Sequence, residues 1–214
     1  MPVLGILSKK SPKNFSSTFW MNPRRAHGGN NPASTPHADL ALPAARFAWF
    51  CSMAEVFEGP PKSGGDILGE AQWLWLTDTL ENSTSQVHLI CSGSQILPTE
   101  HRHEKWADYP DSRKRLLDLL ARTKKTGVIF LSGDRHMAEI SRLEHAGTSF
   151  TEVTSSGMTH FRHDFNNEKN SLRIGDFFAD LNFGTIEIDW DLKKISLAIR
   201  TQAGSVVRNA EVRF

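Results

Sequence analysis

Three absences limit what this 214-residue sequence can be: it has few cysteines, no long apolar run and no excess of charge. Two cysteines are too few for a disulfide framework or a cysteine-rich zinc module. No run approaches the roughly 20 apolar residues of a membrane-spanning helix, so we expect no membrane span. The 25 basic and 24 acidic side chains give a net charge of +1, which does not indicate a nucleic-acid surface. Hydrophobic residues make up 39%, enough for a packed core.

The first 65 residues differ in composition from the rest. Eight of the ten prolines lie within the first 61 residues, and the first acidic residue is Asp39. We therefore divide the chain into an irregular, basic, proline-rich segment (1–65) and a folded part (66–214), with a short helix as one option for the apolar stretch 41–57. A basic, acid-free start is also typical of organelle transit peptides, but early prolines would interrupt their amphipathic helix. We expect a cytoplasmic protein, with an organelle as the alternative.

Periodic patterns in the middle of the chain predict alternating helices and strands. Apolar spacing indicates helices over 69–82 and 109–125 and short buried strands over 86–91 and 128–131. Asp111 or Ser112 is a candidate cap for the second helix, and Gly127 a candidate end. This helix–strand–helix–strand order predicts a βαβ unit around a buried sheet.

The last third has a different pattern. Apolar and polar residues alternate over 178–189, 194–201 and 205–214, which predicts an antiparallel meander. The polar stretch 161–173 before it predicts an exposed loop. The chain is therefore expected to be an α/β protein that ends in an antiparallel sheet.

An acid and an imidazole follow the strand predicted over 128–131. Asp134 and His136 are two residues apart, and in an extended segment such side chains point the same way. Ligands of α/β proteins bind at the carboxyl ends of parallel strands. Carboxylate and imidazole together are suitable ligands for Zn, Mn or Fe. The alternative is that Asp134 caps a turn and His136 is an ordinary surface residue.

Two further polar segments follow predicted strands. Residues 92–106 include Gln95 and an H-x-H pair, His101 and His103, which could bind an anion, or which could belong to a solvated loop. Residues 154–160 combine hydroxyls, a glycine and His160. Backbone N–H groups in such a tight loop can hold phosphate. A plain turn is the alternative for this segment.

Together these segments resemble the C-terminal half of the PhoD-like metallophosphatases, the alkaline phosphatase D family. The resemblance rests on order, spacing and identity in LGEAQWLWL (68–76), SQILP (94–98), EKWADYP (104–110), RLLDLL (115–120), FLSGDRHMAEI (130–140) and TSSGMTH (154–160).

The resemblance implies a fold, an activity and a set of site residues. The fold would be part of an α-β-β-α sandwich of two stacked sheets flanked by helices. The activity would be metal-dependent hydrolysis of a phosphomonoester or phosphodiester, with Ca, Mn, Fe or Zn as the metal. Asp134 and His136 would be the metal ligands and catalytic residues. Arg135 would neutralise phosphate unless it faces away, and Gln95, His101 and His160 would line the substrate pocket.

The sequence departs from the family in its first part. The family carries earlier acidic motifs, whereas residues 1–65 hold only Asp39, Glu55 and Glu58 as acids. One aspartate and one histidine cannot hold a hydrolytic metal pair, which needs carboxylates on both ions. Two hypotheses follow. The chain is a truncated part of an active phosphatase and is inactive alone, or it is a degenerate paralogue that serves as a non-catalytic interaction module built around the meander.

Overall fold

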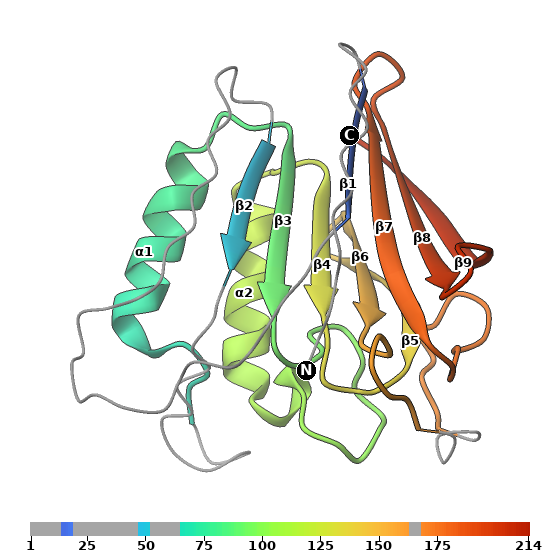
Figure 1. Cartoon of the computed structure of the whole chain (residues 1–214). Helices are drawn as coiled ribbons and strands as arrows, with labels where there is room; N and C mark the ends of the chain where they lie inside the picture. Colours follow the sequence, from blue (N-terminus) through green and yellow to red (C-terminus); the bar gives the residue numbers. More distant parts are fainter. Residues whose placement is uncertain (1–13, 19–46, 52–64, 163–167) are drawn as a thin grey trace, which may run out of the picture.

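The protein is described by a computed structural model that covers residues 14–18, 47–51, 65–162 and 168–214. Its centre is a five-stranded sheet of order β2-β3-β4-β6-β5 (Figure 1). The strands of this sheet are β2 (Phe47–Cys51), β3 (Val87–Ser92), β4 (Val128–Ser132), β5 (Ala138–His145) and β6 (Thr148–Ser155). The first four in the order are parallel, and β5 pairs antiparallel with β6 at the edge. The predicted βαβ unit and its buried sheet are thereby confirmed.

A four-stranded antiparallel sheet packs on one face of the five-stranded sheet. Its order is β1-β7-β8-β9, and its strands are β1 (Asn14–Thr18), β7 (Asn182–Asp189), β8 (Lys194–Thr201) and β9 (Val206–Arg213). Every second residue of β7 and β8 is buried, which is the period expected for strands with one covered face. The predicted C-terminal meander is therefore confirmed.

The two sheets enclose one of the two hydrophobic cores. Ile186 and Ile188 of β7 and Ile195, Leu197 and Ile199 of β8 meet the apolar side chains of the five-stranded sheet. Those partners are Val87, Leu89, Cys91, Ile129, Leu131, Ala138, Ile140 and Val153. This core fixes the two sheets as one sandwich.

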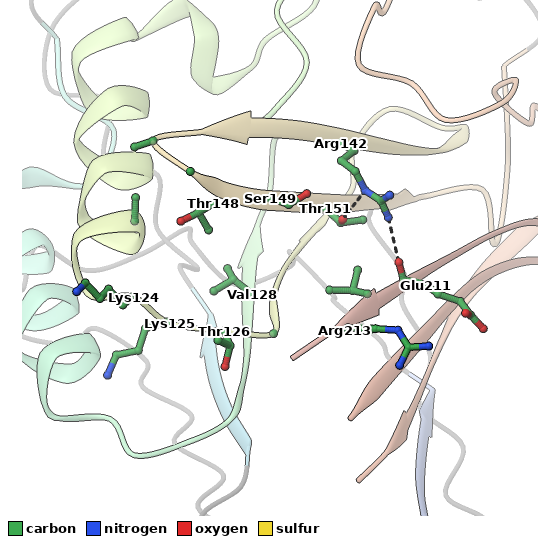
Figure 2. Close-up of a pocket in the computed structure, with 15 residues that line it drawn as sticks. Lys124, Lys125, Thr126, Val128, Arg142, Thr148, Ser149, Thr151, Glu211 and Arg213 are labelled. Carbon is green, nitrogen blue, oxygen red and sulfur yellow. Dashed lines mark hydrogen bonds between the residues drawn. The ribbon is translucent and has the colours of Figure 1, made fainter. Parts of the chain in front are cut away.

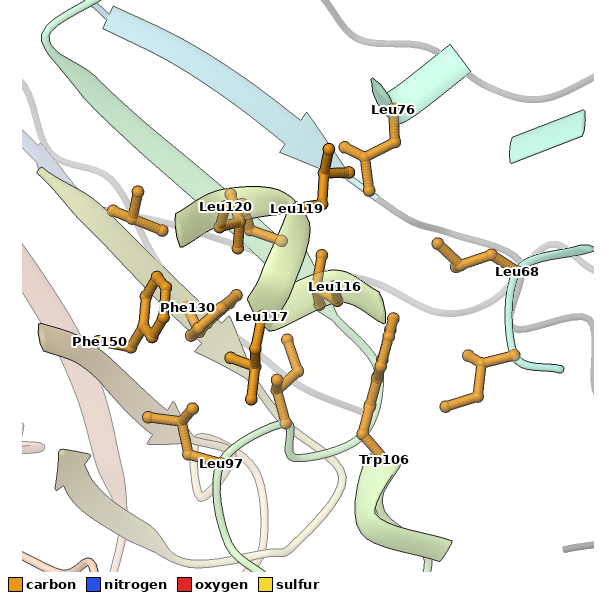
Figure 3. Packing of buried hydrophobic residues seen from close by; sticks show 14 of the residues in the cluster. Leu68, Leu76, Leu97, Trp106, Leu116, Leu117, Leu119, Leu120, Phe130 and Phe150 are labelled. Atoms are coloured by element: carbon orange, nitrogen blue, oxygen red, sulfur yellow. The ribbon is translucent and has the colours of Figure 1, made fainter. Parts of the chain in front are cut away.

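Two helices cover the other face of the five-stranded sheet (Figure 1). They are α1 (Gly69–Asn82) and α2 (Pro110–Arg122), and a short 3-10 turn, η1 (Trp106–Asp108), precedes α2. Leu116, Leu117 and Leu120 of α2 pack toward Phe130 and Phe150 of the sheet (Figure 3). Within the described ranges both α-helices belong to this layer, and none is long and apolar enough to cross a membrane.

The N-terminal segment is where the sequence-based expectation was wrong. It was expected to be irregular, with an optional helix over 41–57, yet 14–18 and 47–51 form strands that join both sheets. A short run such as 47–51 cannot be assigned to helix or strand by periodicity alone. The rest of 1–65, apart from residue 65 itself, lies outside the described residues. The domain boundary after residue 65 stays a prediction.

The second helix also begins and ends differently from the expectation. Tyr109 is its N-cap and makes no side-chain cap, while Ser112 lies inside the first turn and donates a hydrogen bond to Asp66 (2.7 Å). The helix ends at Arg122, and Gly127 stands further on with a φ of +58° in the link to β4. The Ser112 hydroxyl is thus bonded to Asp66 and does not cap the helix.

Candidate active site

The three polar segments meet where the central strands of the five-stranded sheet end. Because β3, β4 and β6 are parallel neighbours, their carboxyl ends lie together (Figure 1). Ser92 pairs with Ser132, and Ser132 pairs with Thr154. Residues 92–106, 133–137 and 155–162 continue from these ends. This is the position at which open α/β sheets bind ligands.

The segment that carries Asp134 and His136 is a link between two strands that are not neighbours. Since β6 lies between β4 and β5, residues 133–137 cross the carboxyl end of β6. Asp134 and His136 take left-handed φ angles of 64° and 52°. The segment is thus a turn and not the extended stretch that we assumed, so the argument that the two side chains point the same way does not apply. Asp134 is exposed, and His136 is partly buried.

His136 and His160 face each other across two loops. Their Nε2 atoms are 3.2 Å apart, and their rings are in edge contact with centroids 4.2 Å apart. The loops are also joined by the backbone, because the N–H of Arg162 donates to the carbonyl of His136 (3.0 Å). Burial, followed by the neighbouring His160, holds the pKa of His136 below its usual value. The uncharged imidazole, which can bind a metal or accept a proton, is thereby favoured.

Arg135 reaches a different part of the site from His136. Its side chain is buried and forms an ion pair with Glu168, whose other carboxylate oxygen lies 3.8 Å from Nε2 of His103. The positive charge of Arg135 adds to burial in lowering the pKa of His101, to about 3. The predicted segment 161–173 is consequently not simply an exposed loop, because Glu168 within it is half-buried in the site; 163–167 lie outside the described residues.

Gln95 lies buried beneath the loops of the candidate site. Its side chain is fully buried, and its amide donates to Glu139 (2.8 Å) and to Oγ1 of Thr154 (2.7 Å). Both amide hydrogens are thus used within the protein. Its amide oxygen has no hydrogen-bond partner among the described residues, and the role in substrate binding that the resemblance implies for Gln95 stays a prediction.

Two buried glutamates, which sequence reasoning missed, tie the loops to the sheet. Glu152 accepts hydrogen bonds from the backbone N–H groups of Ile96 (3.0 Å) and Leu97 (2.6 Å), and burial raises its pKa. Glu139 accepts from Gln95 and forms an ion pair with Arg173 (2.5 Å). A signal was present for Glu152, since it lies within an apolar, strand-like run, where a charge requires partners.

A cleft of about 610 Å³ opens at the opposite end of the strands (Figure 2). It begins where β4 starts, at Val128, and includes the β5–β6 turn and the end of β9. Arg142 closes one side of it by donating to the carbonyl of Glu211 (3.0 Å), and Figure 2 shows the amino groups of Lys124 and Lys125 turned outward. None of the predicted site residues lines this cleft, so it is separate from the candidate active site.

The donor set at the site suits part of a metal centre. Two imidazole nitrogens bound to one tetrahedral ion at about 2.0–2.1 Å lie roughly 3.3 Å from each other. The His136–His160 separation of 3.2 Å matches that spacing. The residues described by the structure contain no group of three or more His, Cys, Asp or Glu side chains arranged to hold an ion. His136 and His160 therefore fit two ligands of a larger set.

Comparisons with known proteins agree with this architecture. A family model for PhoD-like phosphatases matches residues 49–182, which is more than half of the chain. A solved structure titled "Structure of PhoD" superposes with a TM-score of 0.55 at 16% sequence identity, covering 78% of this chain and 38% of that one. At this identity the likeness shows the fold alone, and the chain spans well under half of the matched protein. No curated protein matched the sequence.

Proposed function

We propose, from the premise that the chain belongs to the PhoD-like phosphatase family, that it takes part in metal-dependent phosphoester hydrolysis. The reaction would occur at the edge where residues 92–106, 133–137 and 155–162 meet. The observation that carries the proposal is the pairing of His136 with His160 at 3.2 Å, because it joins two motifs that are 24 residues apart.

The side chains at this edge have separate tasks in the proposed reaction. His136 and His160 would each offer a ring Nε2 to the metal, and Asp134 would add a carboxylate. Thr159 holds the other ring nitrogen of His160 through a hydrogen bond (2.9 Å), which fixes the direction of the ring. A bound metal ion would act as a Lewis acid toward the phosphoryl group. Imidazole ligands favour Zn or Fe over Ca among the metals that the resemblance allows.

The proposal is tested by measuring hydrolysis of p-nitrophenyl phosphate and bis-p-nitrophenyl phosphate with added Zn, Fe, Mn or Ca. His136→Ala is expected to lower metal-dependent turnover by about 100-fold or more, since it removes one of the paired ligands. His145→Ala is the matched control, because His145 pairs with Asp118 (2.7 Å) near the opposite end of β5. Turnover that is measurable in the unchanged protein and equal in His136→Ala would contradict the assignment of the site, and no turnover in either would show that the chain alone is inactive, as the truncation hypothesis expects.

The second candidate is the non-catalytic interaction module. It is favoured by β9, an edge strand of the meander that exposes Val206. An exposed strand edge is able to pair with another chain. Metal binding without turnover, together with a stable complex that is lost on Val206→Lys, would support this candidate over hydrolysis.

A further inference from the structure

A buried cationic group, the guanidinium of Arg135, belongs to the segment 133–137 but points away from His136. Arg135 is 4% exposed, and a guanidinium that is taken out of water needs an anionic partner. Lys105 lies near and is 6% exposed, but Asp108 neutralises it at 2.9 Å. Arg135 obtains its counter-charge from Glu168.

Glu168 is held less firmly than the group that it neutralises. Its side chain is 13% exposed, against 3% for that of Arg135. Besides the ion pair, its carboxylate approaches Nε2 of His103 at 3.8 Å, which is too long for a hydrogen bond. Glu168 is therefore the member of this ion pair that contacts solvent.

His101 provides a second, independent observation. It is 4% exposed, and neither of its ring nitrogens makes a hydrogen bond within the described residues. Its ring lies 6.3 Å from that of His103, between centroids. A buried N–H donor without a partner is destabilising, so such groups in folded proteins commonly mark a place that a ligand or water completes.

We propose that Arg135, His101 and His103 form a subsite for a phosphoryl oxyanion, and that the carboxylate of Glu168 occupies this subsite until the oxyanion displaces it. A phosphoryl group presents more acceptor oxygens than a carboxylate. It can therefore bind the guanidinium through two parallel hydrogen bonds and still accept one from an imidazole. The choice of a phosphoryl group as the ligand rests on the proposed function, whereas the subsite itself rests on the three side chains.

The direct test measures binding of inorganic phosphate by calorimetry and by thermal unfolding, with chloride at matched ionic strength as the reference. Glu168→Gln removes the internal competitor and is expected to bind phosphate about tenfold more tightly than the unchanged protein. This factor applies if the Glu168 carboxylate occupies the subsite in about nine-tenths of the unchanged molecules. Without phosphate this variant is expected to melt at a lower temperature, because Arg135 loses its counter-charge, and phosphate is expected to restore the loss.

Glu100→Gln is the matched control, since it neutralises a glutamate that pairs with Lys169 at 2.8 Å and not with Arg135. It is expected to leave phosphate affinity unchanged. Adding Arg135→Gln to Glu168→Gln should abolish the tighter binding. Should Glu168→Gln fold poorly, Glu168→Asp retains the charge, withdraws it by one methylene and is also expected to raise the affinity.

Phosphate affinity that is equal in the unchanged protein and both Glu168 variants would overturn the subsite, as would a melting loss that phosphate does not restore. Hydrolysis is measured separately from this binding. A protein that binds phosphate as expected but shows no turnover refutes the proposed function and keeps the subsite. Turnover without the expected change in phosphate binding refutes the subsite and keeps the proposed function.

Discussion

His88 shows how burial can couple the ionisation of one residue to the stability of the fold. It lies on β3 with no exposed surface; its Nδ1–H donates to the carbonyl of Thr126 (3.3 Å), and its Nε2 accepts from the hydroxyl of Ser83 (3.0 Å). Burial, helped by the charge of Lys125, lowers the pKa of His88 to about 4 from an ordinary value of 6.5. The folded protein therefore keeps this imidazole uncharged at a pH where the unfolded chain has already protonated it.

The stability of the protein is accordingly expected to decline as the pH falls from about 6.5 to about 4, because protons bind the unfolded state first. The contribution of His88 is roughly 1–3 kcal/mol at the acid end. Urea unfolding at several pH values measures it, with His88→Gln as the variant that loses this part of the decline. An identical pH dependence in the two proteins would show that His88 does not carry it.

At the scale of single residues, the sequence predicted which motifs meet but not which way side chains turn. The approach of His136 to His160 follows from parallel strands whose ends share one edge, and that can be read from the chain. The burial of Gln95 and the orientation of Arg135 depend on Glu139 and Glu168. Both partners lie tens of residues further along, where local patterns give no information about contact.

Among the elements, the start of β7 is held against the end of β6 by Gly157. Asn182 accepts a hydrogen bond from the hydroxyl of Ser155 (2.9 Å), and its backbone N–H donates to the carbonyl of Gly157 (3.0 Å). A Cβ at position 157 would overlap the Asn182 amide and lie 2.8 Å from the carbonyl oxygen of Asp180. The absence of a side chain therefore lets the two sheets approach each other next to the loop of His160.

Gly157→Ala is expected to lower the free energy of unfolding by about 1–3 kcal/mol and to shift the ring NMR signals of His136 and His160, because the loop must move. Gly147→Ala is the control: position 147 has a φ of +77° but open space around it, so only the cost of the left-handed backbone applies. Histidine signals that move equally in both variants would contradict the close-approach explanation.

Elements with a clear period were predictable, and those without one were not. The helix over 69–82 and the three strands of the meander agree with the structure to within a few residues, because each buries one face. β5 was not recognised as a strand, since its first half is buried on both faces and its second half is polar. Its position is fixed by antiparallel pairing with β6, which no pattern within β5 reveals.

For the whole molecule, β4 is, with β3 and β6, one of the strands whose buried side chains belong to both cores. Phe130 faces the helices, and Leu131 faces the four-stranded sheet; both are buried almost completely. The five-stranded sheet thus joins the helical layer to the sandwich through consecutive residues of one strand.

Phe130→Ala is expected to cost about 3–5 kcal/mol and Leu131→Ala about 2–5 kcal/mol of stability. Each variant should unfold in a single transition at a lower temperature than the unchanged protein. The indole NMR signals of Trp106, on the helical side, and Trp190, on the other side, should report the same midpoint. Leu192→Ala, at a side chain that is 60% exposed, serves as the reference with little effect. Separate transitions for the two tryptophans would show that the layers unfold independently.

The overall class of the protein could be anticipated from its sequence, whereas the contribution of its early residues could not. The α/β fold and the C-terminal antiparallel sheet followed from the order of periodic segments. The strands over 14–18 and 47–51 pair with β7 and β3, partners 167 or more and about 40 residues away respectively. Such pairings depend on the whole assembled sheet and leave little trace in local composition.

The turn between β5 and β6 offers a practical use of this arrangement. Ala146 and Gly147 both have left-handed φ angles, as a two-residue hairpin requires, and both are exposed at the end of the sheet opposite to His136 and His160. A fluorescent dye or an immobilising tether attached at this point would leave the loops of the candidate site facing free solution.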